Sequence, residues 1–283
     1  MPSATLLGQS LLSGVLVGGL YALLGVGLSL SWRFLRTINL AHFAFIFLSA
    51  YMTYELVGVD KLSAPIALLV VVPGLFVLGV LLQLIFVRFA LDEFASVLVT
   101  FGIMVIVESF IQWIWTADFR KLESSFGTSS WSVGPIFVPV VESVMFVAAI
   151  AVAIAIWAWL RFTYVGKALR AAAEAPDIAA AFGVHDRRLA LLLAGVSAAT
   201  AGLAGTFVAF ISPLTPSQIY AWIGVVFAAV IMGGLGNPIG ILAASLLIGV
   251  SEAITMALTA PSWAPLVSFT MLILILVLRP DRV

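Results

Sequence analysis

The sequence predicts an all-α polytopic membrane protein with about eight or nine transmembrane helices. Charged residues make up 9% of the 283-residue chain and apolar residues 63%, against roughly 25% and roughly half in a typical soluble domain. Apolar runs of about 20 residues, the length that a helix needs to cross a bilayer, recur from end to end. Strands that span a membrane would alternate apolar and polar residues instead, so we expect the spanning elements to be helices.

The apolar segments follow one another along the whole chain. The first has no basic residue before it and is too long for the core of a signal peptide, so we expect it to be retained as a helix. The segment at 219–233 is shorter than the roughly 20 residues of a perpendicular span. It runs into the glycine-rich stretch Gly233–Gly240, which predicts one short broken or re-entrant element. Read by hydropathy, the nine segments lie at 6–32, 38–57, 64–87, 94–116, 140–160, 188–211, 219–233, 238–257 and 263–279.

The basic residues predict the orientation of these segments, because lysine and arginine gather in cytoplasmic loops. With the N-terminus in the periplasm, ten of the 13 basic residues fall in the cytoplasm, whereas Lys61, Arg120 and Lys121 fall outside. The C-terminus and a charged segment at about 164–186 then lie in the cytoplasm. The ten residues are Arg33, Arg36, Arg88, Arg161, Lys167, Arg170, Arg187, Arg188, Arg279 and Arg282.

The largest polar stretch on the other side is a loop at about 117–139, which this orientation places in the periplasm. We expect turns and a short hairpin within it, and the loop could face a partner outside. The turn-forming residues are Gly127, Thr128, Ser129, Ser130 and Pro135. Residues 1–283 as a whole are expected to form a single transmembrane domain.

The charged segment between the fifth and sixth apolar runs reads YVGKALRAAAEAPDIAAAFGV and cannot lie in hydrocarbon. Its interior has the signals of a short helix. Pro176 fits the first helical position, Asp177 complements the positive helix end, and Gly183 suits a left-handed cap. Ile178, Ala179 and Phe182 would form the apolar face. Such a segment is either a docking helix or an ordinary amphipathic linker.

Composition and motifs argue against several other functions. The chain has no cysteine and only two histidines, His42 and His185, so a thiol-ligated metal is excluded and a metalloenzyme is not indicated. A formal net charge of zero gives no basic surface for nucleic acid. No glycine-rich loop follows a strand to hold a phosphate, so the chain has no nucleotide-binding motif of its own.

Glu108 lies well inside the fourth apolar segment, where an ionised carboxylate is costly. We expect it to face protein or water, or to stay protonated. It is either a residue of the permeation path or a structural carboxylate that bonds to a neighbouring helix or subunit. Gln112, one turn on, shares its helix face and is the nearest local partner. Glu55 and Glu252 are expected at the membrane interface, and no chemistry is assigned to them.

Asn39 and His42 stand three positions apart at the start of the second segment, so we expect both to point to one side of a helix. They could line a cytoplasmic gate, although a single histidine at this depth also suits packing. Gly14 and Gly18 form a small-xxx-small pair that allows close helix packing, within the subunit or against a second one.

Three separated stretches together resemble the permease family of branched-chain amino acid ABC importers, in particular its shorter, H-type member. The first is GGLYALLGVGLSLSWRFLRTINLAHFAFIFLSAYM at Gly18–Met52. The second is the charged segment described above, and the third is VVFAAVIMGGLGNPIGILAASLLIGVSE at Val225–Glu252. Their order and spacing cover nearly the whole chain.

The resemblance implies a transmembrane subunit that pairs with a second, homologous permease in a bacterial or archaeal plasma membrane. It also implies two cytoplasmic ATPases, which use ATP and Mg²⁺, and a periplasmic solute-binding protein. The chain itself would bind no cofactor and hydrolyse nothing. The residues expected to dock in a groove of the ATPase are Glu174, Pro176, Asp177, Ala180, Phe182 and Gly183, with Arg170 nearby.

In the first of the three stretches the family pattern has Asn-x-Ala-His-Gly, and Phe43 replaces the glycine here. A bulky ring would narrow or reshape a nearby path. The resemblance implies a cargo of branched-chain amino acids, other amino acids, urea, short amides or aromatic acids. The residues expected along the translocation path are Asn39, His42, Phe43, Glu108, Gly233, Gly234, Gly236 and Asn237.

Two other functions stay open at this point. Glu108 and the broken segment near Gly233–Pro238 are also compatible with an ion-coupled secondary transporter that needs no ATPase. A membrane-embedded enzyme or scaffold is the third possibility, but the sequence has no evident nucleophile and base pair.

Overall fold

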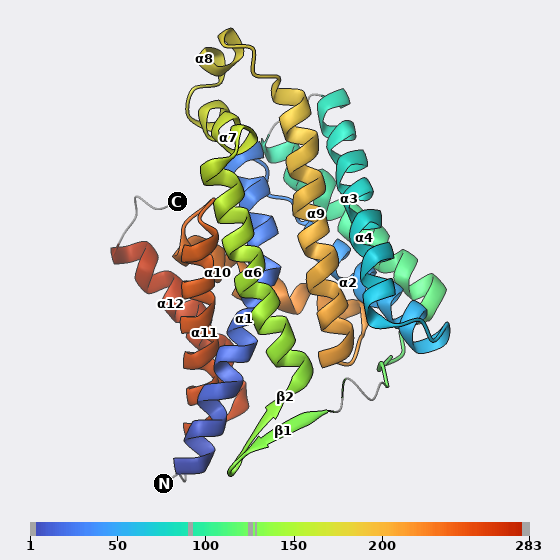
Figure 1. The fold of residues 1–283 in the computed structure, drawn as a ribbon, viewed down its shortest axis with the longest axis vertical. Coiled ribbons are helices and arrows are strands. Elements are labelled where there is room, and N and C mark those ends of the chain that lie inside the picture. Colours follow the sequence, from blue (N-terminus) through green and yellow to red (C-terminus); the bar gives the residue numbers. More distant parts are fainter. Residues whose placement is uncertain (1–3, 90–92, 124–126, 128, 279–283) are drawn as a thin grey trace.

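The protein is described by a computed structural model over residues 4–89, 93–123, 127 and 129–278. It is a bundle of long helices, with a small β-hairpin at one end and a short helical projection at the other (Figure 1). We call these the hairpin end and the α8 end. Eight helices within the described residues are long and apolar enough to cross a membrane, which confirms the predicted all-α polytopic fold.

Helix α1 (Ala4–Leu35) runs from the hairpin end to the α8 end and packs along α11 (Pro238–Leu258). Glycines make this contact close. A Cβ atom at Gly14 would lie 2.7 Å from the Cα of Val250, and one at Gly18 would lie 2.7 Å from the Cα of Leu246. The small-xxx-small pair is therefore used for packing within this chain.

After α1 the chain turns back into the bundle through residues 36–40, and Arg36 has a positive φ of 53°. The backbone of this stretch contacts α4: the Leu40 N–H donates to the Thr100 hydroxyl (3.1 Å), whose own proton has the carbonyls of Val97 (3.1 Å) and Ile38 (3.3 Å) within reach. Helix α2 (Ala41–Thr53) begins at Ala41 and continues as the π-helix η1 (Tyr54–Val59).

This late start corrects one prediction. Asn39 precedes the helix and His42 lies inside its first turn, so the two residues do not share a helix face. The helix starts later than the hydropathy of the segment suggested, and the Leu40 N–H, which a helix start leaves without an intrahelical partner, donates to Thr100. Since the His42 Nε2 atom lies 3.0 Å from the carbonyl oxygen of Leu24, α2 begins beside the middle part of α1.

Four more long helices complete most of the bundle. Helix α9 packs against α1, α2 and α3, and α6 packs against α1. The largest group of buried side chains lies among α1, α2, α3 and α9 and includes Leu23, Phe43 and Tyr51. The bounds are α3 (Ala64–Phe89), α4 (Glu93–Trp115), α6 (Val140–Phe162) and α9 (Asp186–Ile211).

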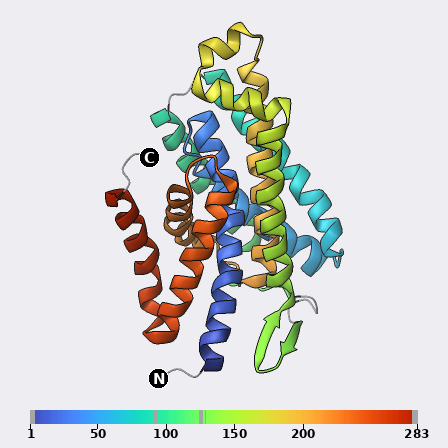
Figure 2. The same ribbon diagram turned by 60° about the vertical axis from the view of Figure 1, so that its left-hand side comes forward.

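The predicted broken element lies between α9 and α11. It consists of the 3₁₀-helix η2 (Pro216–Trp222) and the short helix α10 (Ile223–Gly233), which follow each other directly and together make one of the eight candidate spans. Figure 2 shows α10 as a short brown helix beside the much longer α1, and it does not reach the hairpin end. A cap formed by Thr215 and Gln218 starts η2, and η2 contacts α2 and α4 inside the bundle.

A tight turn joins α10 to α11 near the α8 end. Gly234 and Gly236 have φ values of 89° and 76°, a region that favours glycine. The Gly236 N–H donates to the Ser29 hydroxyl (2.8 Å), and the Asn237 side chain caps α11 by accepting from the Gly240 N–H (3.1 Å). The turn is thus fixed both to α1 and to the helix that follows it.

The last elements are η3 (Pro261–Trp263) and α12 (Ala264–Leu278), which packs on α10 and α11. Helix α12 has 15 residues within the described part of the chain, fewer than the roughly 20 of a full span. Arg279 and Arg282, two of the ten basic residues expected in the cytoplasm, lie outside the described residues.

The loop that follows α4 contains the predicted hairpin, formed by β1 (Ser130–Val133) and β2 (Ile136–Pro139). The Gln9 side chain of α1 holds β2 through two bonds to the backbone of Phe137, at 2.9 and 3.0 Å. Thr128, predicted as a turn residue, lies outside the described residues.

Candidate coupling segment and translocation path

Helices α7 (Tyr164–Glu174) and α8 (Pro176–Ala181) form the projection at the α8 end (Figures 1 and 2). Helix α7 is tied closely to α6. The Thr163 hydroxyl caps α7 by accepting from the Gly166 N–H (3.1 Å). A Cβ atom at Gly166 would lie 2.5 Å from the Cα of Leu160, so only glycine fits at this fold between the two helices.

Helix α8 has the predicted start and end. Pro176 is its first residue, where the missing N–H loses no helical bond. Gly183 has a φ of 83°, its N–H donates to the Ala180 carbonyl (2.9 Å), and the Val184 N–H donates to the Ala179 carbonyl (3.1 Å). These two bonds are those of a Schellman motif.

The apolar residues of α8 are divided between the bundle and solvent. Ala179 is buried, whereas Ile178 is 62% exposed and Phe182, directly after the helix, is 86% exposed. Asp177 and Ala180 are exposed as well. Two large apolar side chains on a charged projection mark a surface that a partner could cover.

Two of the predicted coupling residues lie on α7 rather than on α8. Glu174 ends α7 and is exposed. Arg170 lines a cavity between α7 and α6 together with Arg161, so the structure separates it from the α8 surface. A second contact holds α7. The Arg36 guanidinium, directly after α1, donates to the Ala173 carbonyl of α7 (3.2 Å), and this bond joins α7 to the end of α1.

Glu108 of α4 accepts two hydrogen bonds. Gln112 donates from one turn on (3.3 Å), as predicted. The second donor is the hydroxyl of Tyr220 in η2, which the sequence did not indicate because 112 residues separate the two positions. Gln112 and Tyr220 are both exposed, so this polar cluster lies at the surface of the chain at the depth of the spanning helices.

His42 and Phe43 point in different directions from the start of α2. The His42 ring lies near Gly27 of α1, and a Cβ atom at Gly27 would be 2.7 Å from it. Because its Nε2–H donates to the Leu24 carbonyl, its Nδ1 atom is the free acceptor and has no partner. The Phe43 ring stacks on Phe227 of α10, with centroids 6.2 Å apart and an interplanar angle of 18°.

The stretch before α2 holds further polar atoms without partners. The Thr37 hydroxyl and the Asn39 side-chain oxygen are buried and have no hydrogen bond within the described part of the chain. Together with Nδ1 of His42, these two oxygens are buried polar atoms without partners beside segment 36–40, where the helical backbone is interrupted. Buried polar groups of this kind usually bind water or a ligand. Gly233, Gly234, Gly236 and Asn237 lie instead in and beside the α10–α11 turn.

One buried carboxylate was missed. Glu252 was expected at the membrane interface, but it is buried between α1, α11 and α12. The Tyr21 hydroxyl donates to one of its oxygens (2.8 Å) and the Ser268 hydroxyl donates to the other. No local spacing could have revealed this, since Tyr21 is 231 residues away. Glu55 also has a partner, because the Trp115 indole N–H donates to it (2.8 Å).

Within the described residues no group of three or more histidine, aspartate or glutamate side chains could hold a metal ion. The features present are eight apolar helices, two breaks in the helical backbone inside the bundle and a charged helical projection at one end. They define a polytopic membrane protein of the transporter class.

Residues 10–276 match the family model described as branched-chain amino acid transport system / permease component. The chain belongs to this family, and it is a multi-pass permease of the bacterial inner membrane. Two relatives are the high-affinity branched-chain amino acid transport system permease proteins LivH of Escherichia coli K12 and of Salmonella typhimurium LT2. The chain is 22% identical to each of them, over 97% of this chain and 94% of the relative.

Two other relatives bear related names. The permease protein BraD of Pseudomonas aeruginosa is 22% identical over the same shares of both chains. A probable branched-chain amino acid transport permease protein of Methanocaldococcus jannaschii is 36% identical over 92 residues, which is 32% of this chain and 29% of the relative. No solved structure matches the chain.

Proposed function

We propose that this permease works by alternating access and carries branched-chain amino acids or a related small solute. The related solutes are other amino acids, urea, short amides and aromatic acids. The names of the relatives support the first cargo. In this proposal the chain pairs with a second, homologous permease, two cytoplasmic ATPases that use ATP and Mg²⁺, and a periplasmic solute-binding protein. The N-terminus then lies in the periplasm and the C-terminus in the cytoplasm.

The observation that carries the proposal is the α8 projection. A capped helix that exposes Ile178 and Phe182 at one end of a membrane bundle suits a groove in a soluble partner. The residues proposed to meet the ATPase are Glu174, Pro176, Asp177, Ala180, Phe182 and Gly183, and Arg170 lies on the adjoining helix.

The contacts of α7 suggest how a movement of α8 would reach the membrane. Gly166 fixes α7 against the end of α6, and Arg36 joins α7 to the end of α1. When the ATPases close on ATP, a displacement of α8 would therefore turn α1 and α6 as rigid levers. Because α1 packs tightly on α11 through Gly14 and Gly18, α11 would move with them.

The proposed path runs beside the two backbone breaks. Segment 36–40 supplies the unpartnered oxygens of Thr37 and Asn39, and the contact of α4 with η2 supplies the Glu108–Tyr220 pair. Polar groups at this depth need a polar neighbour or water, and a second permease placed over this face would enclose a water-filled path.

The test is the variant Phe182→Asp in the complete transporter. Burying a carboxylate in an apolar groove is expected to weaken ATPase binding by more than about tenfold, and thus to abolish uptake while insertion is unchanged. Phe119→Asp, at a residue that is 78% exposed in the loop after α4, is the matched control. Normal ATPase binding and uptake by Phe182→Asp would remove the coupling assignment.

Glu108 and the broken segments also favour a second candidate, an ion-coupled transporter that acts without an ATPase. Uptake by liposomes that contain this chain alone, driven by an ion gradient and lost in Glu108→Gln, would support it. We expect no such uptake.

A further inference from the structure

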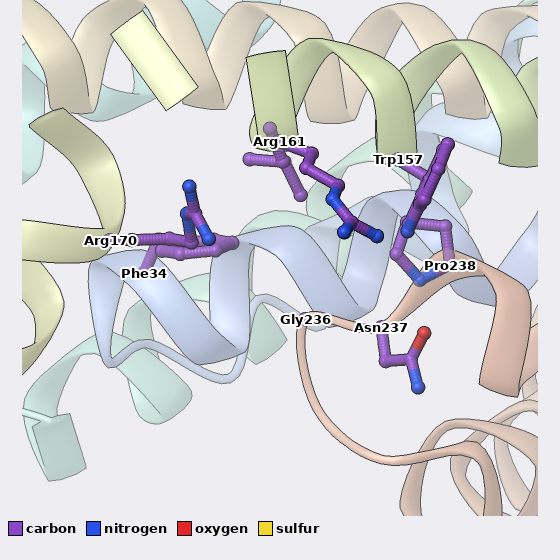
Figure 3. Close-up of a pocket in the computed structure, with 8 residues that line it drawn as sticks. Phe34, Trp157, Arg161, Arg170, Gly236, Asn237 and Pro238 are labelled. Atoms are coloured by element: carbon purple, nitrogen blue, oxygen red, sulfur yellow. The ribbon is translucent and has the colours of Figure 1, made fainter. Parts of the chain in front are cut away.

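A cavity of about 390 Å³ opens between α6, α7, the end of α1 and the α10–α11 turn (Figure 3). Figure 3 shows the guanidinium group of Arg161 directed toward Asn237 and Pro238, with Arg170 beside Phe34 on the other side of the cavity. The residues that line it are Phe34, Trp157, Leu160, Arg161, Arg170, Gly236, Asn237 and Pro238.

The cavity carries two positive charges, and neither Arg161 nor Arg170 forms an ion pair with a described residue. No acidic residue is among its described lining residues. Among the described residues Arg161 has no hydrogen bond, and its guanidinium carbon lies 5.2 Å from the Trp157 ring centroid and 5.8 Å from that of Phe162. Arg170 has no hydrogen bond or ion pair with any described residue. Each guanidinium group therefore presents free N–H donors.

The turn at the bottom of the cavity adds to this positive potential. Asn237 is the N-cap and Pro238 the first residue of α11, so the positive end of a 21-residue helix faces the same space. The aliphatic part of Arg33 packs against Gly236, because a Cβ atom there would lie 2.6 Å from its Cγ. A third cationic side chain, which is exposed, thus stands beside the cavity.

The position of the cavity along α6 indicates the kind of anion. Toward the hairpin end, α6 exposes apolar residues, with Val147 at 64% and Ile154 at 49%. At the cavity the exposed surface becomes aromatic, since Phe162 at the end of α6 is 65% exposed and Tyr164 at the start of α7 is 90% exposed. Aromatic residues gather at the level of lipid headgroups, so the cavity lies where the apolar surface of the bundle meets the headgroup layer.

We propose that this cavity binds the phosphate group of an anionic membrane phospholipid between Arg161 and Arg170, with the acyl chains along the apolar surface of α6. Guanidinium groups match phosphate oxygens in geometry and charge, and basic pockets between spanning helices suit acidic headgroups. A free phosphate ion shares the chemistry of the headgroup, but it would not use the adjoining apolar surface. The inference does not depend on the proposed cargo or on the ATPase contact.

A bound lipid would bridge two parts of the bundle that are far apart in the sequence. Arg161 and Arg170 lie on α6 and α7, whereas Gly236 and Asn237 belong to the α10–α11 turn. Occupancy is therefore expected to hold the α6–α7 corner against the start of α11.

The test is native mass spectrometry of the purified protein in detergent during titration with phosphatidylglycerol or with phosphatidylcholine. We expect the intact protein to bind phosphatidylglycerol in preference. Removing both guanidinium groups in Arg161→Gln/Arg170→Gln should weaken that binding by roughly a hundredfold, about tenfold for each arginine. Arg161→Lys/Arg170→Lys should lose less affinity for phosphatidylglycerol, because both positive charges remain. An unfolding curve like that of the unmodified protein would show that this variant keeps its fold.

The matched control is Arg187→Gln/Arg188→Gln, which removes the same charge from exposed positions on α9 outside the cavity. It should bind phosphatidylglycerol as the intact protein does. Equal binding by the Arg161/Arg170 glutamine variant and the control would overturn the proposal. Retention of inorganic phosphate by the purified protein, with no preference for phosphatidylglycerol over phosphatidylcholine, would show a free-anion site and would overturn the assignment to a lipid.

Discussion

The buried carboxylate of Glu252 is predicted to hold α1, α11 and α12 together, and its removal gives a measurable loss of stability. Glu252→Ala takes away the acceptor of the Tyr21 hydroxyl and of the Ser268 hydroxyl. A buried donor left without its acceptor costs about 1–3 kcal/mol, while hydrogen bonds between membrane helices average about 0.6 kcal/mol and reach about 1.7. We expect Glu252→Ala to lower the free energy of unfolding by about 1–3 kcal/mol.

A double-mutant cycle separates the hydrogen bond from the loss of packing. Unfolding in mixed micelles with sodium dodecyl sulfate would be measured for Tyr21→Phe, Glu252→Ala and the double variant. The expected coupling energy is about 0.6–1.7 kcal/mol. Tyr21→Phe should cost little stability in the Glu252→Ala background, because the acceptor of the Tyr21 hydroxyl is already absent there. Tyr164→Phe, at a residue 90% exposed, is the control and should change stability by less than about 0.5 kcal/mol. Strictly additive effects of the two changes would refute this account of the cluster.

Three further predictions concern helix packing, the α8 cap and the polar cluster. Gly18→Leu should prevent the close approach of α1 to α11 and lower the free energy of unfolding by at least about 2 kcal/mol. Gly74→Leu is the control, because a Cβ atom at Gly74 has no neighbour within 4 Å, and it should be tolerated in the same unfolding assay. Gly183→Ala should destabilise the end of α8 by about 1–2 kcal/mol, measured as faster amide hydrogen exchange of α8; unchanged exchange would contradict the cap. Tyr220→Phe and Glu108→Gln should both alter uptake while leaving the amount of assembled complex unchanged, and a loss of complex would instead show that the pair is structural.

The sequence predicted the features that depend on local chemistry. The spans follow from the length of apolar runs, and α8 follows from Pro176 at its start and Gly183 at its end. The pairing of Glu108 with Gln112 follows from helix geometry. Each of these results needs only neighbours within a few residues, so a single sequence contains the necessary information.

The features that the sequence did not predict depend on distant segments. Tyr220 reaches Glu108 only because η2 folds back against α4. Asn39 precedes α2, and the Leu40 N–H beside it donates to the Thr100 hydroxyl of α4. Glu252 is buried because α12 covers α11. Hydropathy reports how apolar a segment is, but it does not tell which polar groups meet across the bundle.

The central claim is that this permease works through partner ATPases that contact α8. The most direct measurement is co-purification of the chain with the products of its neighbouring genes, followed by ATPase assays with and without the solute-binding protein. The account predicts recovery of two ATPases and a second permease, with ATP hydrolysis stimulated by the loaded binding protein. Recovery of the chain alone, active in gradient-driven uptake, would contradict it.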